Sequence, residues 1–89
     1  MEDQIEYETN YKNPFEKFIL EHVEKEGFKM TAKYRSMNMS RNSFIYNLKN
    51  PLSIKHKTLL DFEKHLKIDM KLLSEKIIET ELEFKRLKI

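Results

Sequence analysis

The sequence predicts a compact all-α domain built from four to five short helices. One glycine and two prolines in 89 residues are too few for the many turns of an all-β domain. Charged residues make up 36% of the chain, and the abundance of leucine, isoleucine, lysine and glutamate favours helices. At this length we expect a single domain, whose small core leaves it thinly stable or dependent on a second copy.

Capping residues mark both ends of a first helix, predicted over about residues 14–26. Asn13-Pro14 is typical of a helix start, with asparagine at the N-cap and proline in the first turn. Gly27, the only glycine, is expected to end the helix, after which Phe28 folds back into the core. Spacings of three and four define the inward face, which carries Phe15, Phe18, Ile19, His22 and Val23.

A second and a third helix follow, separated by a short turn. Thr31 is a candidate cap for the second helix, which reaches about residue 37, and Ser40 is a good N-cap for a third helix over about 41–49. Asn38 lies between them, and asparagine tolerates the left-handed backbone conformation better than most residues. The expected inward residues are Met30, Tyr34 and Met37, then Phe44 and Leu48.

Two further helices complete the predicted domain. Asn50-Pro51 ends the third helix, and Ser53 is expected to cap a fourth over about 54–67. Asp69 is the expected cap of a fifth helix that starts at Met70 and continues at least to residue 80. The core candidates in this part of the chain are Leu59, Leu60, Phe62, Leu66 and Ile68.

Both ends of the chain allow two interpretations. Alternating Ile5, Tyr7, Thr9 and Tyr11 fit a short strand or an arm over residues 1–12, and disorder of the first few residues fits equally well. The C-terminal segment 70–89 continues a heptad spacing. That spacing suits helix packing either within the domain formed by 13–69 or between two copies. The heptad positions are Leu66, Met70, Leu73, Ile77, Thr80, Phe84 and Leu87.

We therefore treat the ends as candidate elements of a homodimer. Leu73, Ile77, Phe84 and Leu87 are the predicted dimerisation residues. Residues 81–85 also alternate, so this stretch has a strand alternative that could pair with residues 5–11 of the same or a partner chain. We prefer the helix.

The charges are distributed unevenly along the chain, although the net charge is only +2. Residues 1–26 carry eight acidic side chains, whereas residues 27–60 carry none. The basic residues within 27–60 are Lys29, Lys33, Arg35, Arg41, Lys49, Lys55 and Lys57. A solvated face of a charge-rich protein would explain this, but a surface that meets a polyanion explains it better, because phosphates attract lysine and repel carboxylates.

Residues 38–48 read NMSRNSFIYNL: a turn residue, an apolar residue, a serine cap, three polar residues and an apolar residue. The next helix has a polar run followed by Thr58-Leu59-Leu60, then Phe62, and later Leu66-Lys67-Ile68. In these features the segment 30–69 resembles the helix-turn-helix domains of the Cro/C1-type phage and plasmid repressors.

The chain departs from that family's pattern in three places. Asn38 stands where glycine is usual, and the start of the second helix lacks the frequent glutamine. Tyr34 stands where the family usually has alanine, so that either its ring tilts outward or Ala32 takes the close contact between the two helices.

The resemblance implies that the third helix lies in the major groove of double-stranded DNA. The implied base contacts are Ser40, Arg41, Asn42, Ser43 and Ile45, with Arg41 suited to guanine, Asn42 to adenine, and Ile45 to a thymine methyl or to the core. The implied backbone contacts are Thr31, Lys33, Tyr46, Lys49, Lys55 and Lys57. Plain structural roles compete with these: Arg41 as a solvated side chain, Asn42 and Ser43 as caps, and Tyr46 as a packing residue.

We therefore expect a sequence-specific transcription regulator, a dimeric repressor whose partners are double-stranded DNA and a second copy of itself. The alternative is a helix-turn-helix module that binds another protein, such as a phage-encoded inhibitor of the anti-CRISPR kind. Its acidic first 26 residues would then mimic DNA or mask a basic surface.

The sequence gives no grounds for an enzyme, and we expect no cofactor and no small-molecule substrate. Cysteine is absent, and His56 and His65 lie nine residues apart, too far for a helical zinc pair. A single glycine cannot build a phosphate-cradling loop. The apolar runs are too short for a membrane span, and the acidic start MEDQIEYETN is unlike a signal peptide, so we expect a cytoplasmic protein.

Overall fold

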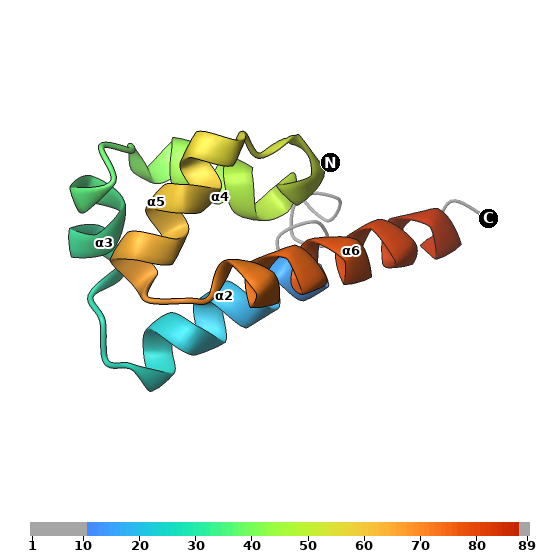
Figure 1. The fold of residues 1–89 in the computed structure, drawn as a ribbon, viewed down its shortest axis with the longest axis horizontal. Helices are drawn as coiled ribbons and strands as arrows, with labels where there is room; N and C mark the ends of the chain where they lie inside the picture. Colours follow the sequence, from blue (N-terminus) through green and yellow to red (C-terminus); the bar gives the residue numbers. More distant parts are fainter. Residues whose placement is uncertain (1–10, 88–89) are drawn as a thin grey trace, which may run out of the picture.

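The computed structural model describes residues 11–87, and every regular element within them is helical (Figure 1). The all-α prediction is confirmed, and the strand alternative for residues 81–85 is wrong because they belong to the last helix. The strand or arm predicted for residues 5–11 lies outside the described residues except for Tyr11. No helix within 11–87 is long and apolar enough to cross a membrane. The elements are α2 (Pro14–Lys25), α3 (Met30–Ser36), α4 (Arg41–Lys49), the 3-10 turn η1 (Pro51–Ser53), α5 (His56–Leu66) and α6 (Met70–Leu87).

The helices form two groups that meet at an aromatic core. Figure 1 shows α2 and α6 side by side along one flank, with α3, α4 and α5 together on the other. Phe62 of α5 joins the groups, because its ring centroid lies 6.1 Å from Phe15 of α2 and 5.8 Å from Phe44 of α4. Tyr34 of α3 extends the chain of rings, 5.7 Å from Phe44. One row of stacked or tilted rings therefore crosses the molecule from α2 to α3.

The start of α2 is fixed by a buried polar network. The Asn13 side chain accepts from the backbone amide of Glu16 at 2.8 Å, and the Glu16 carboxylate reaches back toward the Asn13 amide. This reciprocal pair is a capping box, which satisfies two first-turn donors. The amide of Phe15 donates to the Thr80 hydroxyl of α6 at 2.9 Å, and the Asn13 amide group donates to the Leu48 carbonyl of α4 at 2.9 Å. The network thus joins α2 to both α4 and α6.

Gly27 ends α2 as predicted, at a position that requires an unusual backbone conformation. Its φ of +72° lies in the left-handed region, which glycine adopts without a steric penalty. The amide of Phe28 then donates to the Val23 carbonyl at 3.0 Å, and that of Gly27 to the Glu24 carbonyl at 3.1 Å. These two bonds satisfy the last carbonyls of the helix. Phe28 turns back and packs against the core, as expected.

The turn between α3 and α4 follows the sequence prediction closely. Asn38 has a φ of +61°, and Ser40 caps α4 by accepting from the Ser43 amide at 3.1 Å. The predicted bounds of the third helix, 41–49, are those observed for α4. Phe44 and Leu48 are buried one turn apart, so the inward face of α4 is also confirmed.

Two predicted caps and two predicted core residues are wrong. α3 begins at Met30, one residue before Thr31, and its N-cap position is Lys29. Ser53 ends η1 instead of starting a helix, because Pro51, with its fixed φ, starts a separate 3-10 turn, and α5 begins only at His56. Leu60 is 45% exposed, and Leu59 is half-buried without packing on the core cluster.

The heptad positions of α6 pack mainly within the chain. Leu73 and Thr80 are fully buried, and Ile77 packs against the same core, beside α2. α6 packs on α2 and α5 of the same chain, and the predicted division of the chain between residues 69 and 70 stays a prediction. Leu73 is fully buried by the chain's own helices, which leaves none of its side chain exposed to a second copy in this conformation. Ile77 is half-buried, and its role in dimerisation stays a prediction. Phe84 is half-buried and Leu87 is 64% exposed, on the last turns of α6 that project beyond the other helices in Figure 1.

Candidate nucleic-acid interface

The first two turns of α4 present an exposed polar face. The helical period sends Phe44 and Leu48 into the core and leaves Asn42 and Tyr46 directed away from it. Arg41, one turn before Phe44 and Ile45, is exposed at the edge of the inward side. Tyr46 is 60% exposed, so its predicted packing alternative is the weaker one. Asn42 and Tyr46 lie one turn apart on one line of this face. The arrangement offers a guanidinium, an amide and a phenol without any carboxylate on α4.

The two serines at the start of α4 are engaged with each other. Besides capping the Ser43 amide, the Ser40 hydroxyl donates to the Ser43 hydroxyl at 3.2 Å. Both side chains are exposed. Ser43 keeps a proton that it can donate outward, whereas Ser40 uses both its acceptor and its donor within the helix start. Asn42 makes no cap bond within the described residues, so its capping alternative has no support.

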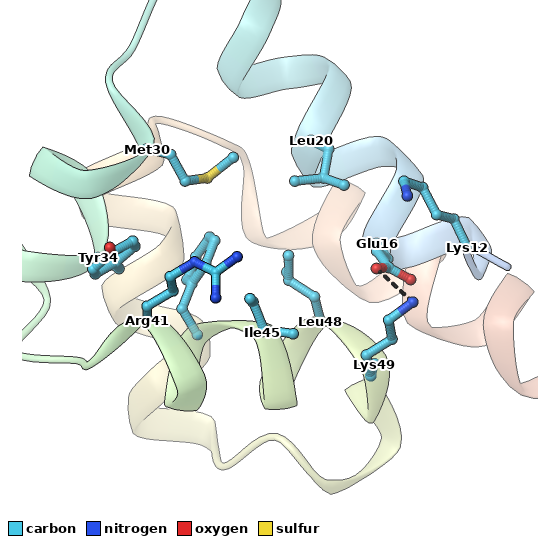
Figure 2. A pocket seen from close by; sticks show the side chains of 10 residues that line it. Lys12, Glu16, Leu20, Met30, Tyr34, Arg41, Ile45, Leu48 and Lys49 are labelled. Atoms are coloured by element: carbon cyan, nitrogen blue, oxygen red, sulfur yellow. Dashed lines mark ion pairs between the residues drawn. The ribbon is translucent and has the colours of Figure 1, made fainter. Parts of the chain in front are cut away.

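Arg41 and Ile45 lie one turn apart on the side of α4 that faces α2. Figure 2 shows both side chains directed over a cavity between α2, α3 and α4. Ile45 is half-buried there, while Arg41 is exposed and makes no ion pair within the described residues. Ile45 therefore lines the wall of a cavity. This position is intermediate between the two roles predicted for it, an outward contact with a thymine methyl and a core residue.

The predicted backbone-contact residues divide into free and engaged side chains. Lys49 is engaged, because its ammonium lies 3.0 Å from the Glu16 carboxylate and donates to the Tyr11 carbonyl at 2.8 Å. Lys33 lies over the Phe28 ring, with its ammonium 4.1 Å from the ring centroid. The remaining four are exposed and free of ion pairs within residues 11–87: Thr31 in α3, Tyr46 in α4, Lys55 just before α5 and Lys57 in its first turn.

The ion pair of Lys49 with Glu16 was not foreseen from the sequence. The Glu16 side chain is only 5% exposed and that of Lys49 is 32% exposed, so the pair is largely shielded from water. Asn13 followed three residues later by Glu16 is a capping-box spacing, which could have identified Glu16 as a structural residue. Nothing in the local sequence indicates its partner on α4. In the folded chain, the Glu16 carboxylate thus lies next to Lys49 of the acid-free stretch 27–60.

The contact between α3 and α4 is made by the tyrosine. Tyr34 packs on Phe44 and is half-buried, whereas Ala32 is exposed. Of the two alternatives left open by the sequence, neither holds as stated. The ring stays in the contact, where it packs on Phe44, and both rings line the cavity beside Arg41.

The described residues offer little other chemistry. No group of three or more histidine, cysteine, aspartate or glutamate side chains within them could hold a metal ion. The Nε2 atom of His22 lies 2.7 Å from the Leu66 carbonyl at the end of α5, and Phe28 packs edge-on against its ring. His22 thus has the half-buried core role expected of it.

Comparison of the chain with protein-family models, with curated proteins and with solved structures finds no significant match in any of the three.

Proposed function

We propose that this protein is a sequence-specific, double-stranded-DNA-binding transcription regulator, a repressor of the Cro/C1 helix-turn-helix kind. In this proposal α3, the turn at Asn38 and α4 form the helix-turn-helix, and α4 enters the major groove. The observation that carries the proposal is the exposed first half of α4, where Arg41, Asn42 and Tyr46 are free of partners within the described residues. These are the side chains that pair with guanine, with adenine and with a phosphate.

The charge distribution supports a polyanionic partner. Free lysines at the start of α5, Lys55 and Lys57, add to the positive charge of Arg41, and residues 27–60 contain no Asp or Glu. The contribution of Lys49 is reduced by its ion pair with Glu16. We therefore assign phosphate contacts to Lys55 and Lys57, and the specific contacts to α4.

The decisive experiment is selection from a random duplex library with the purified protein, followed by sequencing of the retained DNA. An enriched motif supports the proposal, and an inverted repeat with half-sites about one helical turn apart supports a dimer. Arg41→Ala should lower the ratio of specific to scrambled-DNA affinity about tenfold or more, since a good base contact gives about 1–3 kcal/mol of discrimination. Arg35→Ala, which removes an exposed arginine of α3, is the matched control and should keep that ratio.

The proposal fails if no motif is enriched at a salt concentration low enough for any basic protein to bind DNA. Equal losses on specific and scrambled DNA for Arg41→Ala would remove Arg41 as the base-reading residue.

We also propose that two copies associate through the end of α6. Phe84 and Leu87 line a hollow together with Leu52 of η1, and this apolar surface has no cover within the described chain. Leu87→Glu should shift the protein toward a monomer in light scattering at tens of micromolar. Leu72→Glu, at an exposed position near the other end of α6, should not. A wild-type monomer under these conditions would contradict the dimer.

A second candidate function is binding to another protein through the same face. Tyr46 of α4 is a large exposed ring, and Ile45 of the same helix lines an apolar cavity. Salt dependence separates the two candidates, because DNA affinity carried by phosphate contacts falls steeply with salt. Absence of DNA binding at any salt concentration would favour the protein partner.

A further inference from the structure

A cavity of about 290 Å³ lies between α2, α3 and α4, open on one side to solvent (Figure 2). Its lining is mainly apolar and comes from all three helices: Leu20, Met30, Tyr34, Phe44, Ile45 and Leu48. Small-molecule sites are typically concave, mostly apolar and about 300–1,000 Å³ in volume, with a few polar groups that orient the ligand. The size of this cavity matches the smallest of such sites.

The charged side chains at the rim of the cavity carry a net positive charge. Glu16 is the one acidic lining residue, and its carboxylate is paired with Lys49 at 3.0 Å and faces the Asn13 amide. Lys12 and Arg41 are exposed, and neither makes an ion pair or hydrogen bond within the described residues. Figure 2 shows the Arg41 guanidinium directed over the cavity mouth, between Tyr34 and Ile45. The carboxylate is therefore already neutralised, whereas the two cations have no acidic partner among residues 11–87.

We propose that this cavity binds a small amphiphilic monocarboxylate, with an apolar body of medium-chain fatty-acid or naphthoate size. The apolar body would displace water from Leu20, Met30 and Ile45, and its burial supplies the nonpolar part of the affinity. The carboxylate would meet the planar fork of Arg41, which binds carboxylates through two parallel hydrogen bonds.

The small volume excludes a peptide helix, which needs an extended groove. A neutral apolar compound would leave the two rim cations without a partner.

The consequence for regulation rests on the proposed function. Arg41 is the proposed guanine contact, and it also lines the cavity. A bound carboxylate would hold the Arg41 guanidinium against α2 and α3, and so withdraw it from a guanine edge. The ligand would then act as an inducer that competes with specific DNA, because one arginine cannot serve both partners.

The first test measures ligand binding without DNA, so that it does not depend on the proposed function. Octanoate and naphthoate are titrated into the full chain while amide chemical shifts are followed by NMR, and octanol serves as the uncharged control. The expected result is saturable binding of a carboxylate, with shifts at Leu20, Met30 and Ile45, and binding of octanol at least about tenfold weaker. Equal binding of octanol, or shifts that do not saturate, would overturn the proposal.

Two variants test the two parts of the cavity. Arg41→Met keeps the length of an exposed side chain and should weaken carboxylate binding at least about tenfold, whereas Arg35→Met, outside the cavity, should not. Leu20→Phe fills part of the cavity from α2 and should weaken binding of both carboxylates. If Leu20→Phe fails to fold by circular dichroism, the Arg41→Met and Arg35→Met pair still decides. Unchanged binding by Arg41→Met would overturn the proposal.

A final arm adds DNA selected by the wild-type protein. Release of that DNA by octanoate, but not by octanol, supports the inducer role. Carboxylate binding without DNA release would contradict the inducer role and leave the cavity assignment standing. If the library selection yields no motif, the proposed function fails, while the NMR titration still decides on the cavity.

Discussion

Replacement of Thr80 by valine tests the buried network that joins α2 to α6. Valine has the shape of threonine and a similar helix propensity, so the change removes a hydroxyl and little else. Thr80 is fully buried, and its hydroxyl accepts from the Phe15 amide at 2.9 Å and donates to the Lys76 carbonyl at 2.8 Å. The Phe15 amide lies in the first turn of α2, where no helix carbonyl is available to accept it.

The expected cost follows from this geometry. Without the hydroxyl, the Phe15 amide is a buried donor with no acceptor, which costs about 1–3 kcal/mol of unfolding free energy. The Lys76 carbonyl loses less, because it keeps the helical bond from the Thr80 amide. For a chain of this size, 1 kcal/mol corresponds to a fall in Tm of about 4–8 °C.

The assay is urea and thermal unfolding followed by circular dichroism. Thr31→Val makes the same chemical change at an exposed helix position and is the matched control, expected within about 0.5 kcal/mol of the wild type. The destabilisation by Thr80→Val should be the same at protein concentrations that differ tenfold, because α6 packs on α2 of its own chain. Equal stability of the two variants would refute the buried-donor argument. A concentration-dependent loss would show that the stretch of α6 around Thr80 packs on a second copy and not on α2 of its own chain.

Three further predictions concern the turn and the charges. Lys49→Met should destabilise the fold by about 1–2 kcal/mol, because Glu16 is left buried without its cation, and adding Glu16→Gln should recover part of the loss in urea unfolding. Lys57→Met should flatten the slope of log affinity against log salt for DNA by about 0.9, whereas Lys64→Met, on the same helix but outside the acid-free stretch, should leave it unchanged. Asn38→Val should lower the unfolding free energy by about 1–2 kcal/mol, while Asn38→Gly stays neutral or stabilises, because the φ of +61° suits glycine. An equal slope for both lysine variants, or an Asn38→Val protein as stable as the wild type, would contradict the respective argument.

Helix ends that are set by residues within about one turn of the chain were predictable from the sequence. Gly27, Asn38 and Ser40 each act on the backbone within a few residues, so the end of α2 and the bounds of α4 followed from residue type. The start of α5 could not be predicted from residue type, because Pro51 allows either a loop or the 3-10 turn that is observed. Both conformations satisfy the fixed φ of proline, and the choice depends on packing against α4 and α6.

Features that depend on distant parts of the chain were beyond sequence reasoning. A heptad seam has the same period whether it packs on its own domain or on a partner, so the spacing that includes Leu73 could not decide between them. The pairing of Lys49 with Glu16, and the cavity between three helices, arise only when the helices meet. The exposed residues of α4 were predictable, since they depend only on which side of one helix faces inward.

The two ends of α4 are held very differently. Its last turn is joined to the rest of the molecule, through the bond from Asn13 to the Leu48 carbonyl and the ion pair between Lys49 and Glu16. Its first turns, apart from Phe44 and the half-buried Ile45, are exposed to solvent, and their start is capped by the Ser40 side chain. Substitutions at 41, 42 and 46 therefore remove little that stabilises the fold. Such a helix can change what it recognises over many generations while the chain keeps folding in the same way.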